Sequence, residues 1–152
     1  MEKFYEVYFD LLKALNQQMQ AALEGVPQEG IDWVPGADMN SMAVLVTHTS
    51  GGTRFLIGDF VGRLPSHRDR EAEFKITNVD VPHLKQHLDQ TMDVVKTVLE
   101  GLTLSDLEST RISPRDGKET TVAWCLIHAL EHFAQHVGHI QITRQMWDQR
   151  MK

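Results

Sequence analysis

Four histidines fall within twelve residues near the carboxyl end of the 152-residue chain, in the stretch HALEHFAQHVGH, residues 128–139. At 100° per residue of an α-helix they form one narrow stripe, and Cys125 falls close to it. Histidines four residues apart have Cβ atoms about 5–6 Å apart, so two imidazoles can bind one metal ion. The stripe contains two such overlapping pairs, His128 with His132 and His132 with His136. Their spacing alone does not choose between the pairs.

A third ligand would have to come from another helix, because a catalytic site of this kind takes three protein ligands and keeps one position open. His48 is the candidate, since it stands among apolar and small residues in VLVTHTSGG. A buried imidazole nitrogen without a partner costs roughly 1–3 kcal/mol, so His48 needs one. That partner is either a metal ion or only a hydroxyl or carbonyl group, and the residues leave both interpretations open. His83 and His87 are expected near solvent, because Leu84 and Leu88 take the core face of their helix.

Four amphipathic segments are expected to position these histidines. Apolar residues recur at three- and four-residue steps over residues 2–23, 41–62, 80–102 and 120–151. The predicted buried stripe of the first segment consists of Phe4, Val7, Leu11, Leu15, Met19 and Leu23. The pattern predicts an all-α fold, a four-helix bundle that forms a single domain over residues 1–152.

Two local features of the sequence bear on this bundle. The connection before the last helix contains Pro114 and Asp116-Gly117, which makes a short hairpin possible there. Gly51-Gly52 interrupts the second helix, where each glycine costs up to about 1 kcal/mol relative to alanine. The pair predicts either close packing against a neighbour or room for a substrate.

Composition narrows the class of protein. The net charge of −6 and the pI near 5.7 argue against a nucleic-acid partner, which would require clustered lysine and arginine. The sequence contains no basic-then-apolar leader, and no apolar run approaches the roughly 20 residues that span a bilayer. The single cysteine, Cys125, fits a reducing compartment, and we read it as an inert core residue. The chain is therefore expected to be cytoplasmic, with no membrane partner.

Two stretches resemble a known family: LVTHTSGGTRFLIGDF around His48 and TVAWCLIHALEHFAQHVGHIQITRQMW around the histidine stripe. Together with the amphipathic first helix, they are similar to the DinB-like (YfiT-like) superfamily of metal-dependent four-helix-bundle proteins. The resemblance spans nearly the whole chain and places the family's metal triad on His48, His132 and His136. His128 matches a position that is often histidine outside the triad. His139 stands where glutamine is common, which leaves it open as an outer-sphere group or a spare ligand.

The resemblance implies a divalent metal ion, nickel or zinc, a small-molecule substrate and a homodimer. Relatives use low-molecular-weight thiols such as mycothiol or bacillithiol in transferase and isomerase reactions, so this chemistry is our first hypothesis. A metal-dependent hydrolase and a non-catalytic, stress-associated metal-binding dimer are the alternatives, and a helical dimer without metal is a further one. An open coordination position facing a pocket would favour an enzyme, whereas an ion sealed by Phe55 and Phe133 would favour a structural role. Residues expected to support the ligands from the second coordination sphere are Glu131, Asp59 and Gln141.

Overall fold

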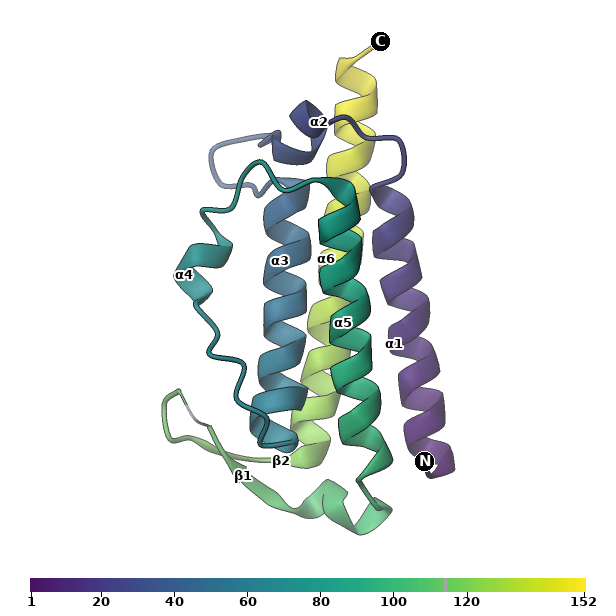
Figure 1. Ribbon diagram of the computed structural model, residues 1–152, viewed down its shortest axis with the longest axis vertical. Coiled ribbons are helices and arrows are strands. Elements are labelled where there is room, and N and C mark those ends of the chain that lie inside the picture. Colours follow the sequence, from purple (N-terminus) through teal and green to yellow (C-terminus); the bar gives the residue numbers. More distant parts are fainter. Residues whose placement is uncertain (114) are drawn as a thin grey trace.

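The computed structural model describes residues 1–113 and 115–152, and in this part of the chain four long helical segments stand side by side (Figure 1). They are α1 (Lys3–Ala22), α3 (Met42–Thr53) with its continuation η1 (Arg54–Val61), α5 (Val81–Glu100) and α6 (Val122–Arg150). The shorter elements are α2 (Gln28–Asp32), α4 (Arg70–Glu73), η2 (Leu104–Glu108), β1 (Thr110–Ile112) and β2 (Glu119–Thr121). The predicted all-α four-helix bundle is confirmed.

Three of the long helices begin at a side-chain cap. The oxygens of Ser41, Asp80 and Thr121 each accept a hydrogen bond from a backbone N–H in the first turn of α3, α5 and α6. Such a cap satisfies one of the donors that a helix start leaves without an intrahelical partner. The second predicted helix also changes character along its length, because its last eight residues, η1, form π-helical turns. Turns of this kind occur frequently at functional sites.

The helices are connected so that α3 and α5 run in the same direction. The chain leaves η1 at one end of the bundle, returns along the outside of α3, and enters α5 at the opposite end (Figure 1). This returning segment, residues 62–80, is called the crossover below, and it contains the single-turn helix α4. The crossover therefore places its side chains beside the middle of α3. On its other sides, α3 packs against α5 and α6.

The predicted hairpin before the last helix is present. Strand β1 pairs antiparallel with β2, with Thr110 opposite Thr121 and Ile112 opposite Glu119. Figure 1 shows the hairpin at the end of the bundle where α6 begins. Pro114, which belongs to the predicted connection, lies outside the described residues. None of the described helices combines the length and the apolar character that crossing a membrane requires.

The buried face of α1 differs from the predicted stripe in its first half. Met19 and Leu23 are buried as predicted, but Leu11 is 52% exposed. Phe4 and Val7 are exposed in the same way. The residues buried in the core are instead Tyr5, Tyr8 and Leu12, each of which directly follows a residue of the predicted stripe.

Hydrogen bonds of the two tyrosines explain this rotation of α1. The hydroxyl of Tyr5 donates to the backbone oxygen of Thr103 at 2.7 Å, and that of Tyr8 donates to the backbone oxygen of Leu126 at 2.7 Å. A tyrosine can bury its large ring when its hydroxyl finds a partner. These carbonyl partners are distant in sequence, so the apolar periodicity of α1 does not reveal them.

Substitution of neighbouring leucines tests this orientation of α1. Leu12 is fully buried, so Leu12→Ala should lower the free energy of unfolding by about 2–5 kcal/mol. Leu11→Ala removes an exposed side chain and should change it by less than about 0.5 kcal/mol. Urea unfolding of the two variants measures both values. Equal losses for Leu11→Ala and Leu12→Ala would contradict the observed register.

Candidate metal centre

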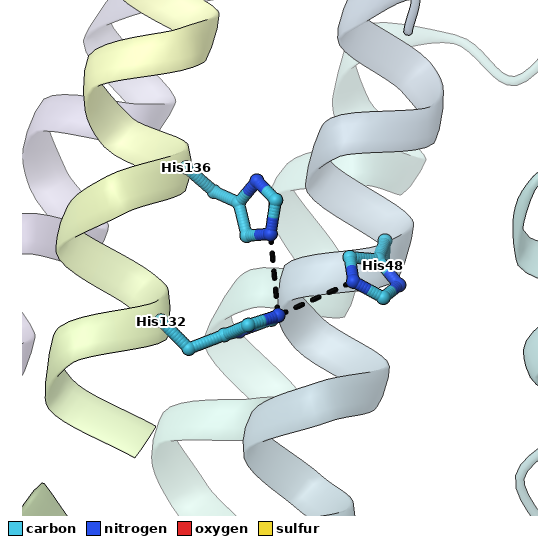
Figure 2. Close-up of side chains that lie close together, drawn as sticks. All are labelled: His48, His132 and His136. Atoms are coloured by element: carbon cyan, nitrogen blue, oxygen red, sulfur yellow. Dashed lines mark hydrogen bonds between the residues drawn. The ribbon is translucent and has the colours of Figure 1, made fainter. Parts of the chain in front are cut away.

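The structure brings His48 of α3 against His132 and His136 of α6 (Figure 2). The Nε2 atom of His132 lies 3.2 Å from Nε2 of His48 and 3.2 Å from Nε2 of His136. The ligand atoms of all three residues lie within 4.8 Å of one another. Three nitrogens bound tetrahedrally at the usual Zn–N length would be roughly 3.3–3.4 Å apart. The spacing of these three residues, called the triad below, therefore suits one small cation.

Two glycines of α3 allow this close approach. A Cβ atom on Gly52 would lie 2.8 Å from Cε1 of His132, and one on Gly51 would overlap the carboxylate of Glu73. The structure bears out close packing against a neighbour for both glycines, and Gly52 also lines the pocket beside the triad. The neighbours are themselves residues of the site. The glycines thus set how near α6 and the crossover come to His48.

Glu73 of the crossover supports His48 from behind. Its Oε2 atom lies 3.0 Å from Nδ1 of His48, and Arg68 donates to both of its oxygens at 2.6 and 2.8 Å. Burial acts to raise the pKa of Glu73, but the hydrogen bonds from Arg68 and His48 lower it below its ordinary value. Because an ionised carboxylate only accepts, Nδ1 of His48 carries the proton. The lone pair of His48 is therefore on Nε2, the atom that faces the other two histidines.

His132 and His136, the two triad histidines on α6, are uncharged at neutral pH. Burial, with the neighbouring imidazoles of His136 and His48, lowers the pKa of His132 to about 3. Burial, with His48 and His139, lowers the pKa of His136 to about 4. A metal ion binds the neutral imidazole, so a low pKa keeps protons from competing for the site.

The remaining histidines of the stripe stand apart from this group. The ring of His128 stacks against Trp124 with centroids 4.7 Å apart, and its centroid is 6.3 Å from that of His132. His139 is exposed, and its Nδ1 atom lies 3.4 Å from Nδ1 of His136. His139 therefore lies on the side of the His136 ring opposite Nε2. The group of possible ligands found in the described chain consists of the triad alone.

The residues expected in the second coordination sphere lie elsewhere. Glu131 contacts His128, Asp59 accepts from Ser66, and Gln141 pairs with Gln18, so this expectation was wrong. The groups that do stand behind a triad histidine are Glu73, which contacts Nδ1 of His48, and Arg68, which contacts Glu73. Neither was predicted from the sequence. They stand in the crossover, whose irregular sequence has no periodicity that could assign them to a face.

Cys125 is fully buried and belongs to the core cluster. Burial raises the pKa of its thiol to about 11. A thiol of this kind is not ionised at neutral pH and does not act as a nucleophile. Its interpretation as an inert core residue is therefore retained.

A pocket of about 510 Å³ opens onto the triad, and His48, His132 and His128 form part of its wall. Phe55, Leu56 and Phe60 of η1 provide an apolar part of the wall, and residues of the hairpin line the pocket as well. Phe133, one of the two residues that could have sealed the site, is fully buried in the core. The other, Phe55, forms only one part of the pocket wall, so the triad faces an open cavity.

The profile of the DinB superfamily matches residues 11–140. The chain belongs to the DinB superfamily. Among solved structures, the fold is similar to a conserved protein from Enterococcus faecalis, with a TM-score of 0.77 and 16% identity over 96% of this chain and 98% of that one. It is also similar to the protein described as sibling lethal factor precursor DfsB, with a TM-score of 0.71 and 14% identity over 100% and 99% of the two chains. No curated protein matches the chain.

The low pKa values of His132 and His136 predict how the stability of this DinB-superfamily protein depends on pH. In the unfolded chain these groups take up protons near pH 6.5, whereas in the folded protein they do so only near pH 3 for His132 and pH 4 for His136. The free energy of unfolding of the metal-free protein should therefore fall as the pH decreases from 7.5 to 5. Urea unfolding in the presence of a chelator measures this change. In a His132→Gln/His136→Gln variant the decrease should be clearly smaller, and an unchanged slope would contradict the assignment.

The close packing of Gly52 predicts a specific effect of a single methyl group. Gly52→Ala should displace the ring of His132 and lower the affinity for Zn²⁺ at least tenfold, as titration of the metal-free protein would measure. Gly138 of α6 is the matched control, because a Cβ atom there meets nothing within 4 Å. Gly138→Ala should raise the free energy of unfolding by up to about 1 kcal/mol and leave Zn²⁺ binding unchanged. Equal behaviour of the two variants would show that Gly52 does not position His132.

Proposed function

We propose that this DinB-superfamily protein is a metal-dependent enzyme in which His48, His132 and His136 hold one divalent ion. The observation that carries the proposal is the convergence of three Nε2 atoms, two pairs of them 3.2 Å apart, at the wall of a pocket. Two of these imidazoles are kept uncharged by their surroundings. Imidazole suits several divalent ions, and zinc and nickel are the two we propose.

The pocket supports a catalytic role over a structural one. Structural zinc sites are closed by four protein ligands, whereas catalytic sites have three and leave a position for water or substrate. The possible ligand group in the described residues contains three histidines. Because His48 and His132 line the pocket of about 510 Å³, a small molecule can reach the position that the protein leaves free.

The protein's own groups define what each part of the site would do. A bound divalent ion supplies Lewis-acid chemistry and lowers the pKa of a water molecule or thiol that contacts it. Glu73 holds the proton on Nδ1 of His48, so this ligand keeps one tautomer and one orientation. The apolar side formed by Phe55, Leu56 and Phe60 excludes water and can hold the apolar part of a substrate.

Thiol-dependent transfer or isomerisation fits this site better than hydrolysis. Hydrolysis at such a site commonly uses a carboxylate as general base, and Glu73 is the carboxylate that contacts the triad. Both oxygens of Glu73 are already engaged, by Arg68 and by His48. A thiol held against a divalent ion at His48, His132 and His136 would have a lowered pKa and release its proton to solvent, so it would need no such base. We therefore propose a low-molecular-weight thiol as the second component of the reaction.

Metal content provides the first test. Protein purified without an affinity tag should contain, or take up, one Zn²⁺ or Ni²⁺ per chain by elemental analysis. His48→Ala and His136→Ala should each lose tight binding while the far-ultraviolet circular dichroism stays unchanged. His83→Ala is the control, because His83 is exposed on α5, and it should bind as the wild type does. Normal metal content in His48→Ala would refute the triad.

Activity assays of the metal-loaded protein distinguish a thiol-dependent transferase, a hydrolase and a non-catalytic metal-binding protein. A thiol, with monochlorobimane as the electrophile, tests transfer, and p-nitrophenyl acetate tests hydrolysis. Thiol conjugation above the chelator-treated control supports the proposal, while ester cleavage alone would favour a hydrolase. Stoichiometric metal with neither reaction across a panel of thiols and electrophiles would favour the non-catalytic alternative.

A further inference from the structure

Two arginines from separate segments, Arg68 and Arg115, lie over one aromatic ring, that of Phe55, beside the triad. The guanidinium carbons of Arg68 and Arg115 lie 5.8 and 5.7 Å from the centroid of Phe55. Together with Arg70, they line the pocket that opens onto the triad. The same four residues also line a neighbouring pocket of about 320 Å³. Arg68, Arg70 and Arg115 are called the arginine cluster below.

On the wall of the larger pocket, the carboxylates do not balance the positive charge. Asp59, which lines the smaller pocket, accepts hydrogen bonds from Ser66. Arg68 is neutralised by Glu73, but a single carboxylate, Asp116, is shared between Arg115 at 3.8 Å and Lys118 at 3.9 Å. A carboxylate at such distances on an exposed loop contributes little binding energy, and it is screened by salt.

Arg70 adds an uncompensated charge. It has no carboxylate within 4 Å in the described part of the chain, and its guanidinium carbon lies 5.1 Å from the ring centroid of Phe74. Once Arg68 is assigned to Glu73, three cations and two carboxylates, Asp116 and Glu119, remain on the wall of the larger pocket. This local excess of positive charge stands out in a chain with a net charge of −6.

We propose that the arginine cluster binds the anionic end of the substrate, and that the substrate is a small oxyanion, a carboxylate or phosphate, on a flat apolar body. This inference rests on the proposed function for the position of the reacting end, beside His48 and His132. Arg70 and Arg115 are the recognition groups, since guanidinium presents paired N–H donors that match carboxylate and phosphate oxygens. The apolar body lies between Phe55 and Trp124, which line the same pocket.

The geometry selects a small molecule rather than a nucleic acid. The cations converge on a concave pocket of about 510 Å³, a size typical of small-ligand sites. A nucleic-acid backbone requires a row of cations over an extended surface, and the net charge of −6 opposes its approach.

Binding of three matched aromatic probes to the metal-free protein tests the proposal. They are 1-naphthoate, 1-naphthyl phosphate and the neutral 1-naphthylmethanol, titrated by calorimetry at low salt. The wild type should bind at least one of the two anions about tenfold or more tightly than the alcohol. A preference for both assigns oxyanions in general, and a preference for one identifies the carboxylate or the phosphate. Equal affinity for all three probes would overturn the proposal.

A charge-matched pair of variants locates the recognition groups. Arg70→Gln/Arg115→Gln should reduce the affinity for the anions to that for the alcohol, and the exposed positions allow the fold to be retained. Lys3→Gln/Lys96→Gln removes the same charge at exposed positions outside both pockets and should keep the preference. A full anion preference in the arginine variant would overturn the proposal.

The metal content of the same variants separates this inference from the proposed enzyme. Arg70→Gln/Arg115→Gln should bind Zn²⁺ as the wild type does, because neither residue contacts the triad. An anion preference in a protein that binds no metal would refute the proposed enzyme and leave the arginine cluster as a ligand site. Metal binding without any anion preference would refute only the inference about the substrate.

Discussion

The site depends on one constraint, which is the small number of protons that three closely packed neutral imidazoles carry. The Nε2 atom of His132 has a second Nε2 atom at 3.2 Å on each of two sides. A neutral imidazole has one proton and one lone pair, so His132 cannot form a good hydrogen bond with both neighbours through one atom. Since ionised Glu73 keeps the proton of His48 on Nδ1, the Nε2 atom of His48 offers only a lone pair. One cation that accepted lone pairs from all three nitrogens would resolve this arrangement without further protons.

The connectivity of the bundle places other segments of the chain on two sides of His48. On one side, α6 supplies His132 and His136 with helical spacing, so this pair is preorganised by local structure. On the other side, the crossover runs back along α3 and brings Glu73 into contact with Nδ1 of His48 (Figure 1). A short loop between antiparallel helices would have left this side of His48 to solvent. The absence of side chains at Gly51 and Gly52 lets both neighbours approach.

The helical parts of the site could be predicted from the sequence because their information is local. The spacing of His132 and His136 and the apolar surroundings of His48 point to α6 and α3, and the family resemblance selects between the overlapping pairs. The partners of His48 could not be predicted in this way. Glu73 lies in a single-turn helix within an irregular, charged segment, and its place beside His48 is decided by the path of the whole crossover. The tyrosines of α1 illustrate the same limit, since their burial depends on carbonyl groups far away in sequence.

The three histidines of the triad differ in the groups that contact the far side of each ring, so the site is asymmetric. His48 donates to an ionised carboxylate that Arg68 holds in place, so its ring is the best fixed of the three. Among the described residues, the buried Nδ1 atom of His132 has no hydrogen-bond partner, and the ring is oriented by packing against Gly52 instead. His136 is backed by the exposed His139, at the position where the family resemblance expects glutamine. If these residues hold an ion, His48 is therefore the ligand with the most rigid support. His136, whose neighbour His139 is exposed, is the ligand that could move to adapt the coordination sphere to a substrate.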